Sequence, residues 1–284
     1  MEPSGTPRWW RRRRPARAGL AGLTPARLVA ALVCAGLLAL WAATDAGRGA
    51  GRGPVALPAL SGTKPVAVIW APHPDDETYG AAGIIAGLLD RGYSVVEVLL
   101  THGEASVALD KVNAERAQAG QPPYTRRGFG RARVREYQAA AGAAGVDACI
   151  IYDFPDGGLT WRDVRAVVEE VDREYRPAAH YGTAGGDDEP RRHPDHAALY
   201  FGLARARVSA AEKNYYYVYA TPAGRAGVTL LPLDAGARRL KAAMLDCYRL
   251  EDWRSQRYGI GFHSTPTLWL KSRAQTCEYL RAGA

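Results

Sequence analysis

Residues Val66–Glu77 read VAVIWAPHPDDE, and this stretch decides how the rest of the chain is interpreted. Its first part, Val66–Trp70, is a short apolar run typical of a buried parallel strand. The polar part begins at His73 and places one imidazole and three carboxylates directly after that strand. Because ligands of open α/β sheets bind at the carboxyl ends of the strands, we expect a functional site here.

The three carboxylates precede a predicted helix. Residues Thr78–Arg91 carry apolar side chains at helical spacing, so Asp75, Asp76 and Glu77 belong to its N-terminal turn. Helix dipoles favour acidic residues there, and an N-cap role for Asp75 is the alternative to a catalytic one. Three consecutive carboxylates exceed what capping requires, because the like charges repel unless a cation lies among them.

A second motif, HPDH at His193–His196, lies far downstream. Three of the six histidines of the chain belong to these two short motifs. Two histidines and a carboxylate around one divalent ion, with an open coordination position, are how catalytic zinc is held. The same ligands suit ferrous iron. The sequence therefore predicts one divalent metal ion, with Zn²⁺ as the first choice and Fe²⁺ as the alternative.

The order and separation of HPDDE and HPDH resemble those of the PIG-L family of metal-dependent N-deacetylases, also called LmbE-like proteins. The segment Asp153–Leu159, read DFPDGGL, is also similar to the family, and the resemblance covers residues 65–284. It implies an α/β fold with a Rossmann-like, mostly parallel sheet and helices on both faces. It also implies hydrolysis of an N-acetyl group, usually on an N-acetylglucosamine unit.

The resemblance also implies roles for individual residues. His73, Asp76 and His196 are the expected metal ligands, and Asp75 is the expected general base for a metal-activated water. His193 is expected to stabilise the oxyanion of the tetrahedral intermediate. Either Asp75 or His193 would return a proton to the leaving amine, giving acetate and a free amine.

Other residues near the motifs receive weaker assignments. Glu77 is interpreted as a support for its neighbours rather than a base, and Asp195 as a cap of the helix that follows HPDH. Asp156 and Arg133 are candidate substrate contacts, with Arg135 as a further candidate. A turn role for Asp156 and solvated helix charges for the two arginines are the alternatives.

The net charge of +8 does not indicate nucleic-acid binding. Residues 1–64 hold ten of the 37 Lys and Arg residues and two of the 29 Asp and Glu residues, so the remaining 220 residues carry 27 of each. The basic character therefore belongs to the N-terminal segment, and no nucleic-acid recognition motif accompanies it. We expect a small-molecule, glycan or glycolipid substrate and no nucleic-acid partner.

The N-terminal segment has the pattern of an export signal. Residues 1–17 are basic, residues 18–45 contain the uncharged run Leu28–Ala43, and residues 46–64 read as a flexible linker. These features predict an N-terminal hydrophobic helix that makes the chain a single-pass protein of the cell membrane, with residues 65–284 outside the cytoplasm. Secretion after signal cleavage is the alternative. An exported domain would also permit a disulfide between Cys247 and Cys277.

The rest of the chain alternates strand and helix patterns. Residues 105–130 are polar and read as a long loop, either a substrate-facing excursion or a surface insertion. Strands are expected at 93–100, 149–152, 178–181 and 215–219, and helices at 131–145, 161–175, 196–207 and 234–257.

Three functions remain open from the sequence. The first is removal of an acetyl group from an amino sugar or related amide outside the cytoplasm. The second is a membrane-tethered carbohydrate-binding module that kept the fold without the chemistry, although a binding module has no evident need for a carboxylate beside the metal. The third is attack by the same site on another amide or an ester.

Overall fold

The computed structural model describes residues 57–185, 193–209, 211–219, 222, 224–252 and 255–283. At its centre lies strand β1, Val66–Ala71, which is the apolar run before the first motif. It pairs in parallel with β2, Ser94–Thr101, on one side and with β4, Ala179–Thr183, on the other. The chain thus leaves β1 toward one edge of the sheet and later returns to its other side.

Seven strands form this sheet in the order β3-β2-β1-β4-β5-β9-β6 among the described residues. β3, Ala148–Phe154, and β5, Glu212–Tyr216, extend the parallel part. β9, Cys277–Ala282, runs antiparallel to both β5 and β6, Val228–Pro232. The predicted mostly parallel sheet is confirmed, with an antiparallel strand inserted near one edge.

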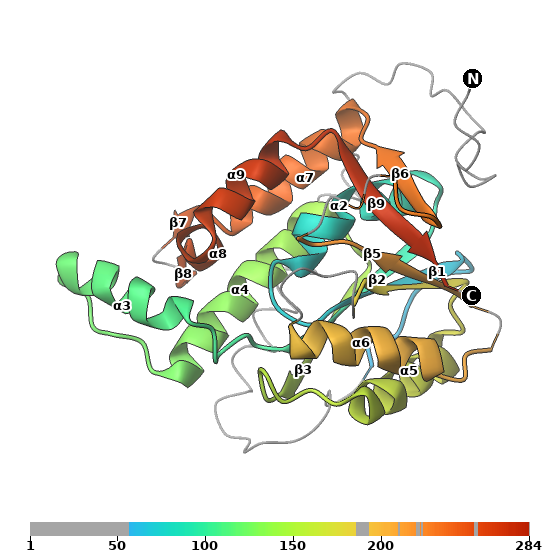
Figure 1. Ribbon diagram of the computed structural model, residues 1–284, viewed down its shortest axis with the longest axis horizontal. Helices are drawn as coiled ribbons and strands as arrows, with labels where there is room; N and C mark the ends of the chain where they lie inside the picture. The colour runs from blue at the N-terminus through green and yellow to red at the C-terminus, as the bar shows by residue number, and fades with distance from the viewer. Residues whose placement is uncertain are drawn as a thin grey trace. The chain divides into compact units, whose positions relative to one another are not determined.

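Helices cover both faces of the sheet (Figure 1). α2, Asp76–Asp90, α4, Arg126–Ala144, and α7, Ala235–Cys247, pack on one face. α5, Trp161–Tyr175, and α6, Pro194–Arg205, pack on the other. This arrangement requires strands that are apolar on both sides, which is why the β1 sequence is a continuous apolar run rather than an alternating one.

β1 contributes to both hydrophobic cores. Ala67 and Ile69 belong to the core under α2, α4 and α7, whereas Val68 and Trp70 belong to the core under α5 and α6. All four side chains are fully buried. The strand that carries the first motif is therefore held from both sides.

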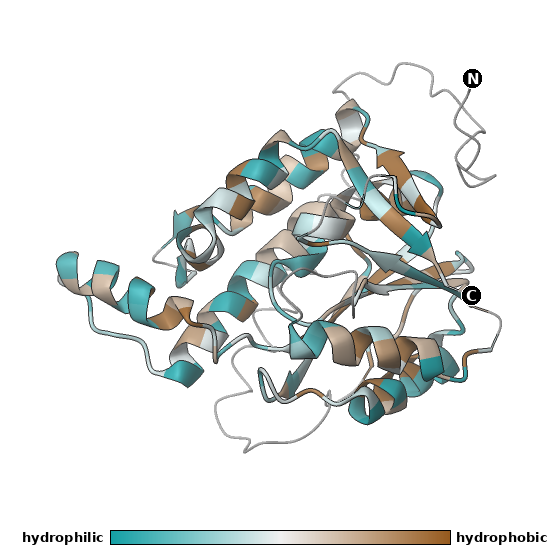
Figure 2. Ribbon diagram, in the orientation of Figure 1, coloured by the Kyte–Doolittle hydropathy of each residue, from teal (hydrophilic) through white to brown (hydrophobic). Residues whose placement is uncertain are grey.

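The region predicted as a long loop contains a helix, α3, Ala108–Gln118, and α4 begins at Arg126 rather than at residue 131. α3 buries only Ala108 and Val112, and hydrophilic residues predominate beyond its first turns (Figure 2). A helix that packs so little of its surface has no apolar stripe, so hydrophobic periodicity could not reveal it.

The C-terminal region also differs from the prediction. The helix expected to reach residue 257 ends at Cys247, and four short elements lie between it and β9. They are β7, Glu251–Asp252, β8, Arg257–Tyr258, α8, Ile260–Ser264, and α9, Pro266–Ala274. Tyr248 ends α7 because its amide bonds back to the Leu245 carbonyl at 3.1 Å and its ring is buried.

The cysteines of the described residues are not paired. Cys149, Cys247 and Cys277 are free thiols. The disulfide that an exported domain would have permitted between Cys247 and Cys277 is therefore absent from the structure.

The predicted single-pass membrane location is wrong for the part of the chain that the structure describes. No helix there combines the length and the apolar character needed to cross a bilayer. The longest, α4, has 19 residues and carries five arginines. The predicted segments 1–17 and 18–45, with the hydrophobic helix, and the linker residues 46–56 lie outside the described residues.

Residues 57–64, the described part of the predicted linker, contact the domain. Leu57 and Leu60 pack against the core under α5 and α6. The Tyr175 hydroxyl donates a hydrogen bond of 2.7 Å to the Pro58 carbonyl. Contacts with the sheet domain therefore begin before residue 65.

Candidate metal centre and active site

The two motifs meet at the point where the chain changes direction across the sheet. The first follows β1 and the second precedes α6, after β4, and these two strands are neighbours. Loops leaving adjacent parallel strands toward opposite edges open a crevice at their carboxyl ends, which is the usual ligand site of such sheets. This placement brings side chains more than a hundred positions apart into contact.

Three side chains converge on one point at this edge. Asp76 Oδ2 lies 3.1 Å from His73 Nδ1 and 3.1 Å from His196 Nε2. The two imidazole rings are stacked with their centroids 5.3 Å apart. All three residues are buried. The structure thus brings together the three side chains that the sequence predicted as metal ligands.

The geometry and chemistry of this trio fit a divalent metal ion. One ligand atom from each residue lies within 4.8 Å of the other two. Ligands at tetrahedral positions around Zn²⁺ lie roughly 3.3 Å from one another, given bonds of about 2.0 Å. Two neutral imidazoles and one carboxylate suit Zn²⁺ or Fe²⁺ and leave coordination positions open for water and substrate.

The second ring nitrogen of His73 is held by carboxylates. Nε2 lies 3.1 Å from Asp195 Oδ2 and 3.3 Å from Asp156 Oδ1. Burial alone would lower the pKa of His73, but hydrogen bonds to Asp156, Asp195 and Asp76 raise it well above its usual value. The surroundings of this ring therefore favour positive charge, which a metal ion also supplies. A carboxylate on the distal nitrogen is the usual way a metal-binding histidine is oriented.

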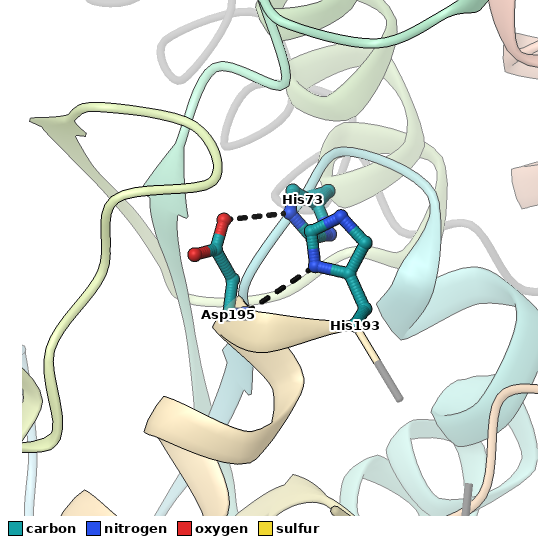
Figure 3. A group of neighbouring side chains, drawn as sticks. All are labelled: His73, His193 and Asp195. Carbon is teal, nitrogen blue, oxygen red and sulfur yellow. Dashed lines mark hydrogen bonds and ion pairs between the residues drawn. The ribbon is translucent and has the colours of Figure 1, made fainter. Parts of the chain in front are cut away.

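Asp195 does not cap α6 as predicted. The N-cap residue is His193, whose ring nitrogen accepts a 3.3 Å hydrogen bond from the Asp195 amide. The Asp195 carboxylate turns instead toward His73 (Figure 3) and accepts hydrogen bonds from the Gly157 and Leu159 amides at 2.8 and 3.1 Å. The capping prediction is wrong because these partners come from another loop, which local sequence does not reveal.

Asp75 precedes Asp76 in the chain and differs from an ordinary helix-capping aspartate in its hydrogen bonding and its pKa. It precedes α2 at the N-cap position, but its side chain makes no capping hydrogen bond. Burial raises the pKa of Asp75 to about 7, and the neighbouring Arg133 opposes that rise. Asp76 behaves differently: burial would raise its pKa, but the neighbouring His196 and His73 rings lower it. Adjacent carboxyl groups thus have different proton affinities.

Arg133 reaches Asp75 from α4 and is itself buried. Its guanidinium donates to Asp75 Oδ2 at 3.2 Å, to the Pro74 carbonyl at 2.7 Å and to the Gly103 carbonyl at 2.9 Å. Gly103 has a φ of 65°, and a Cβ atom there would clash with the Arg133 guanidinium, so another residue would strain the backbone and displace Arg133. By contrast, Arg135 donates to the Gln256 carbonyl on the protein surface.

Asp156 and His193 both contact His73. Asp156 Oδ2 accepts a hydrogen bond of 2.8 Å from the Ala105 amide. Burial would raise its pKa, but the hydrogen bond with His73 lowers it to about 2. The His193 ring lies edge-on to His73 with centroids 4.4 Å apart. Burial, together with the His73 and His196 rings, lowers the pKa of His193.

Two tyrosines near the site were not assigned from the sequence. The Tyr219 hydroxyl lies 3.5 Å from Asp76 Oδ1, and its ring stacks on His196 with centroids 5.5 Å apart. The Tyr248 hydroxyl donates to Glu77 at 2.8 Å. Tyr219 is the last residue of the run Tyr215–Tyr219, and the other residues of that run are buried. The sequence therefore gave no reason to separate Tyr219 from core residues.

Known proteins similar to this chain include deacetylases, as the motifs of the site led us to expect. The family model described as PIG-L, GlcNAc-PI de-N-acetylase, matches residues 68–228. A Bacillus anthracis protein assigned as N-acetyl-α-D-glucosaminyl L-malate deacetylase 2 is 28% identical over 157 residues. That match covers 54% of this chain and 64% of the relative, so the chain spans somewhat less than two thirds of the relative's length.

Solved structures share the fold. A 4-carboxy-2-hydroxymuconate hydratase from Pseudomonas putida superposes with a TM-score of 0.55 at 20% identity, covering 78% of this chain and 96% of that one. The N,N'-diacetylchitobiose deacetylase of Pyrococcus horikoshii superposes with a TM-score of 0.52 at 18% identity, covering 76% and 82%. Since one relative is a hydratase and the other a deacetylase, the fold alone does not decide the reaction.

The family model covers more than half of the chain. It includes both histidine motifs and the segment Asp153–Leu159, whose amides bond to Asp195. The structure assembles those motifs into two groups of possible metal ligands that share His73, one with Asp76 and His196 and the other with His193 and Asp195. The chain therefore belongs to the PIG-L family.

Proposed function

We propose that this protein is a metal-dependent N-deacetylase that acts on an N-acetylglucosamine-type amino sugar or a related amide. The observation that carries the proposal is the convergence of His73, Asp76 and His196. Asp75 precedes Asp76 in the chain and interacts electrostatically with Asp76 and His73. The family description names a GlcNAc-PI de-N-acetylase, and the Bacillus anthracis relative is assigned to a glucosaminyl malate conjugate. Both names describe removal of acetyl from an N-acetylglucosamine unit.

The residues that would hold the metal are His73 through Nδ1, Asp76 through Oδ2 and His196 through Nε2. A divalent ion bound there would polarise the amide carbonyl and make hydroxide available near neutral pH. Asp195 fixes the orientation of the His73 ring through its distal nitrogen. Tyr219 contacts the second oxygen of Asp76, which favours binding of that carboxylate through one oxygen.

Asp75 is proposed as the general base. A pKa raised to about 7 allows its carboxylate to accept a proton from the attacking water and to release it again near neutral pH. Arg133 fixes the carboxylate by donating to Oδ2. Attack of the water oxygen on the acetamide carbonyl would form a carbon–oxygen bond while Asp75 takes the water proton. Collapse of the tetrahedral intermediate would then break the carbon–nitrogen bond as the departing nitrogen takes one proton, so the products are acetate and a free amine.

His193 is proposed to act at the carbonyl oxygen and at the leaving amine. It is half-buried next to His73 and His196. Its lowered pKa favours the neutral ring. Because Nδ1 accepts from the Asp195 amide, the Nε2–H is the group that would donate to the carbonyl oxygen or to the departing amine. Asp156 and Arg133, at the same edge of the sheet, are proposed substrate contacts.

Acetate release from the full chain tests this function. The panel contains N-acetylglucosamine conjugates, glycans and glycolipids, each paired with its non-acetylated counterpart, and one O-acetyl ester. Assays are run with Zn²⁺, with Fe²⁺ and after chelation. Release that requires metal and the N-acetyl group supports the proposal. Release from the ester alone supports another hydrolase, and sugar binding without any release supports the carbohydrate-binding alternative.

A further inference from the structure

The carboxylate of Glu77 lies directly behind Asp75 and accepts hydrogen bonds from three groups. Its Oε2 accepts from the Asp75 amide at 3.2 Å. Its Oε1 accepts from the Thr78 hydroxyl at 2.6 Å and from the Tyr248 hydroxyl at 2.8 Å. Glu77 is fully buried. A buried carboxyl group that accepts from three donors is held rigidly, because each lost donor leaves a buried oxygen without a hydrogen-bond partner.

The Asp75 peptide that this carboxylate holds has a strained backbone. Asp75 has φ 105° and ψ −23°, and it is one of three described residues other than glycine with a positive φ. Such a conformation is unfavourable for a residue other than glycine and persists only where the surroundings enforce it. Hydrogen bonds hold the backbone on both sides of this residue. Glu77 accepts from the Asp75 amide, Arg133 donates to the preceding Pro74 carbonyl, and the Asp75 carbonyl accepts from the Tyr79 amide at 2.9 Å.

Tyr248 fixes Glu77 from a distant part of the chain. It follows the last residue of α7, 171 positions beyond Glu77, and is 1% exposed. Burial raises the pKa of Tyr248 well above its usual value, so the hydroxyl stays protonated and can donate. A Cβ atom at Gly261 would lie 2.8 Å from Tyr248 Cβ, which shows how closely α8 packs against this residue.

We propose that Glu77 and Tyr248 are positioning residues that keep the Asp75 peptide in its strained conformation and thereby aim its carboxylate at the reacting centre. This inference rests on the proposed function, in which Asp75 is the base. Neither residue touches the substrate; each acts through Asp75. The strain is then part of the site, since relaxation of φ at Asp75 would turn the carboxylate away from the metal-ligand trio.

Tyr248→Phe tests the proposal, because it removes one hydroxyl and keeps the ring. In the full chain we expect kcat to fall about tenfold or more, as small misplacements of catalytic groups do. KM and the metal dissociation constant should stay within about twofold of the wild type. Tyr137→Phe is the matched control: Tyr137 is also fully buried in the same core, and its hydroxyl has no hydrogen-bond partner among the described residues. It should leave kcat unchanged.

Glu77→Gln provides a second variant of nearly the same volume. Its amide nitrogen cannot accept a hydrogen bond, so it should lower kcat as well. In the Glu77→Gln background, Tyr248→Phe should have little further effect on kcat, because both changes disturb the same contact. Independent, multiplying effects of the two substitutions on kcat would overturn the proposal, as would an unchanged kcat in both single variants.

Hydrogen exchange of the Asp75 amide, measured by NMR, tests the positioning role of Glu77 and Tyr248 without an activity assay. We expect slow exchange in the wild type and in Tyr137→Phe, and at least tenfold faster exchange in Tyr248→Phe and Glu77→Gln. Unchanged protection in both variants overturns the proposal even if kcat falls. If the wild type releases no acetate from any substrate, the proposed function fails, and the exchange rates still show whether Glu77 and Tyr248 hold Asp75.

Discussion

At the scale of single residues, the adjacent carboxyl groups of Asp75 and Asp76 have pKa values shifted in opposite directions. Burial raises the pKa of Asp75 to about 7, whereas the His196 and His73 rings hold the pKa of Asp76 below its usual value. We predict that Asp75→Asn keeps the metal but lowers turnover by about 10²–10⁴, the usual contribution of a general base. Metal analysis and acetate release measure the two effects.

The matched control for Asp75→Asn is Asp153→Asn. Asp153 lies at the end of β3, and its side chain is 57% exposed beside His102. We expect this variant to keep both metal and turnover. Equal turnover in Asp75→Asn and the wild type would show that another group accepts the proton.

Asp195 carries a second prediction, because its carboxylate orients His73 rather than capping α6. Asp195→Asn should weaken metal binding by about 10–100-fold, as loss of a carboxylate on a metal-binding histidine usually does. Competition with a chromophoric chelator measures the dissociation constant. Asp163→Asn should leave metal affinity unchanged, since it alters a half-buried carboxylate in α5 that accepts a hydrogen bond from Thr160, the N-cap residue of that helix. Equal affinities in the two variants would contradict the orienting role.

The motifs made part of the site predictable. His73 and Asp76 directly follow a recognisable strand, and the resemblance of HPDDE and HPDH to the PIG-L family joined His196 to them. The supporting residues could not, because their contacts are long-range: Tyr248 meets Glu77 across 171 positions and Tyr219 meets Asp76 across 143. Local sequence contains no information about such pairs, and the two tyrosines look like ordinary core residues.

At the scale of elements, hydrophobic periodicity predicted the helices that bury an apolar stripe against the sheet. Helix α5 has the predicted bounds, Trp161–Tyr175, because four valines line its buried side. α3 was missed because it buries only two residues. β9 was missed because its sequence CEYLRA contains Glu278, which is 2% exposed. A charged residue in a strand argues against burial unless its partner is known.

That partner is Lys241, and the pair yields the third prediction. Lys241 Nζ lies 2.7 Å from Glu278 Oε1 and donates to the Tyr79 carbonyl at 2.8 Å, so it joins α7, β9 and α2. Lys241→Met leaves the Glu278 carboxylate buried without its countercharge and should reduce the free energy of unfolding by about 3–5 kcal/mol. Urea unfolding measures the loss.

A second substitution separates lost charge pairing from lost packing. Adding Glu278→Gln to Lys241→Met removes the buried charge, so the double variant should recover part of the stability. Arg273→Met is the control, since Arg273 pairs with Asp246 on the surface; it should cost at most about 1 kcal/mol. A double variant that is less stable than Lys241→Met would show that packing, not charge, dominates.

At the scale of the whole molecule, a buried hydrogen-bonded chain links the sheet to α5. The Trp70 indole donates to His180 Nδ1 at 3.1 Å, and His180 Nε2 lies 3.3 Å from Asp172 Oδ1. Trp70 lies in β1, His180 in β4 and Asp172 in α5. Since Nδ1 accepts a hydrogen bond, the folded protein requires the neutral ring, with the proton on Nε2.

This requirement makes stability depend on pH. Burial lowers the pKa of His180 to about 4, although Asp172 opposes the shift. In the unfolded chain the imidazole binds a proton below a pKa of about 6.5, so between these values the unfolded state holds more protons. The free energy of unfolding should therefore fall as the pH drops, by about 2 kcal/mol from pH 7.5 to pH 5.

His180→Gln should flatten this slope, whereas His263→Gln, at a surface position, should keep it. Urea unfolding of chelator-treated protein measures all three slopes. Equal slopes for the wild type and His180→Gln would mean that His180 binds a proton as readily in the folded protein as in the unfolded chain.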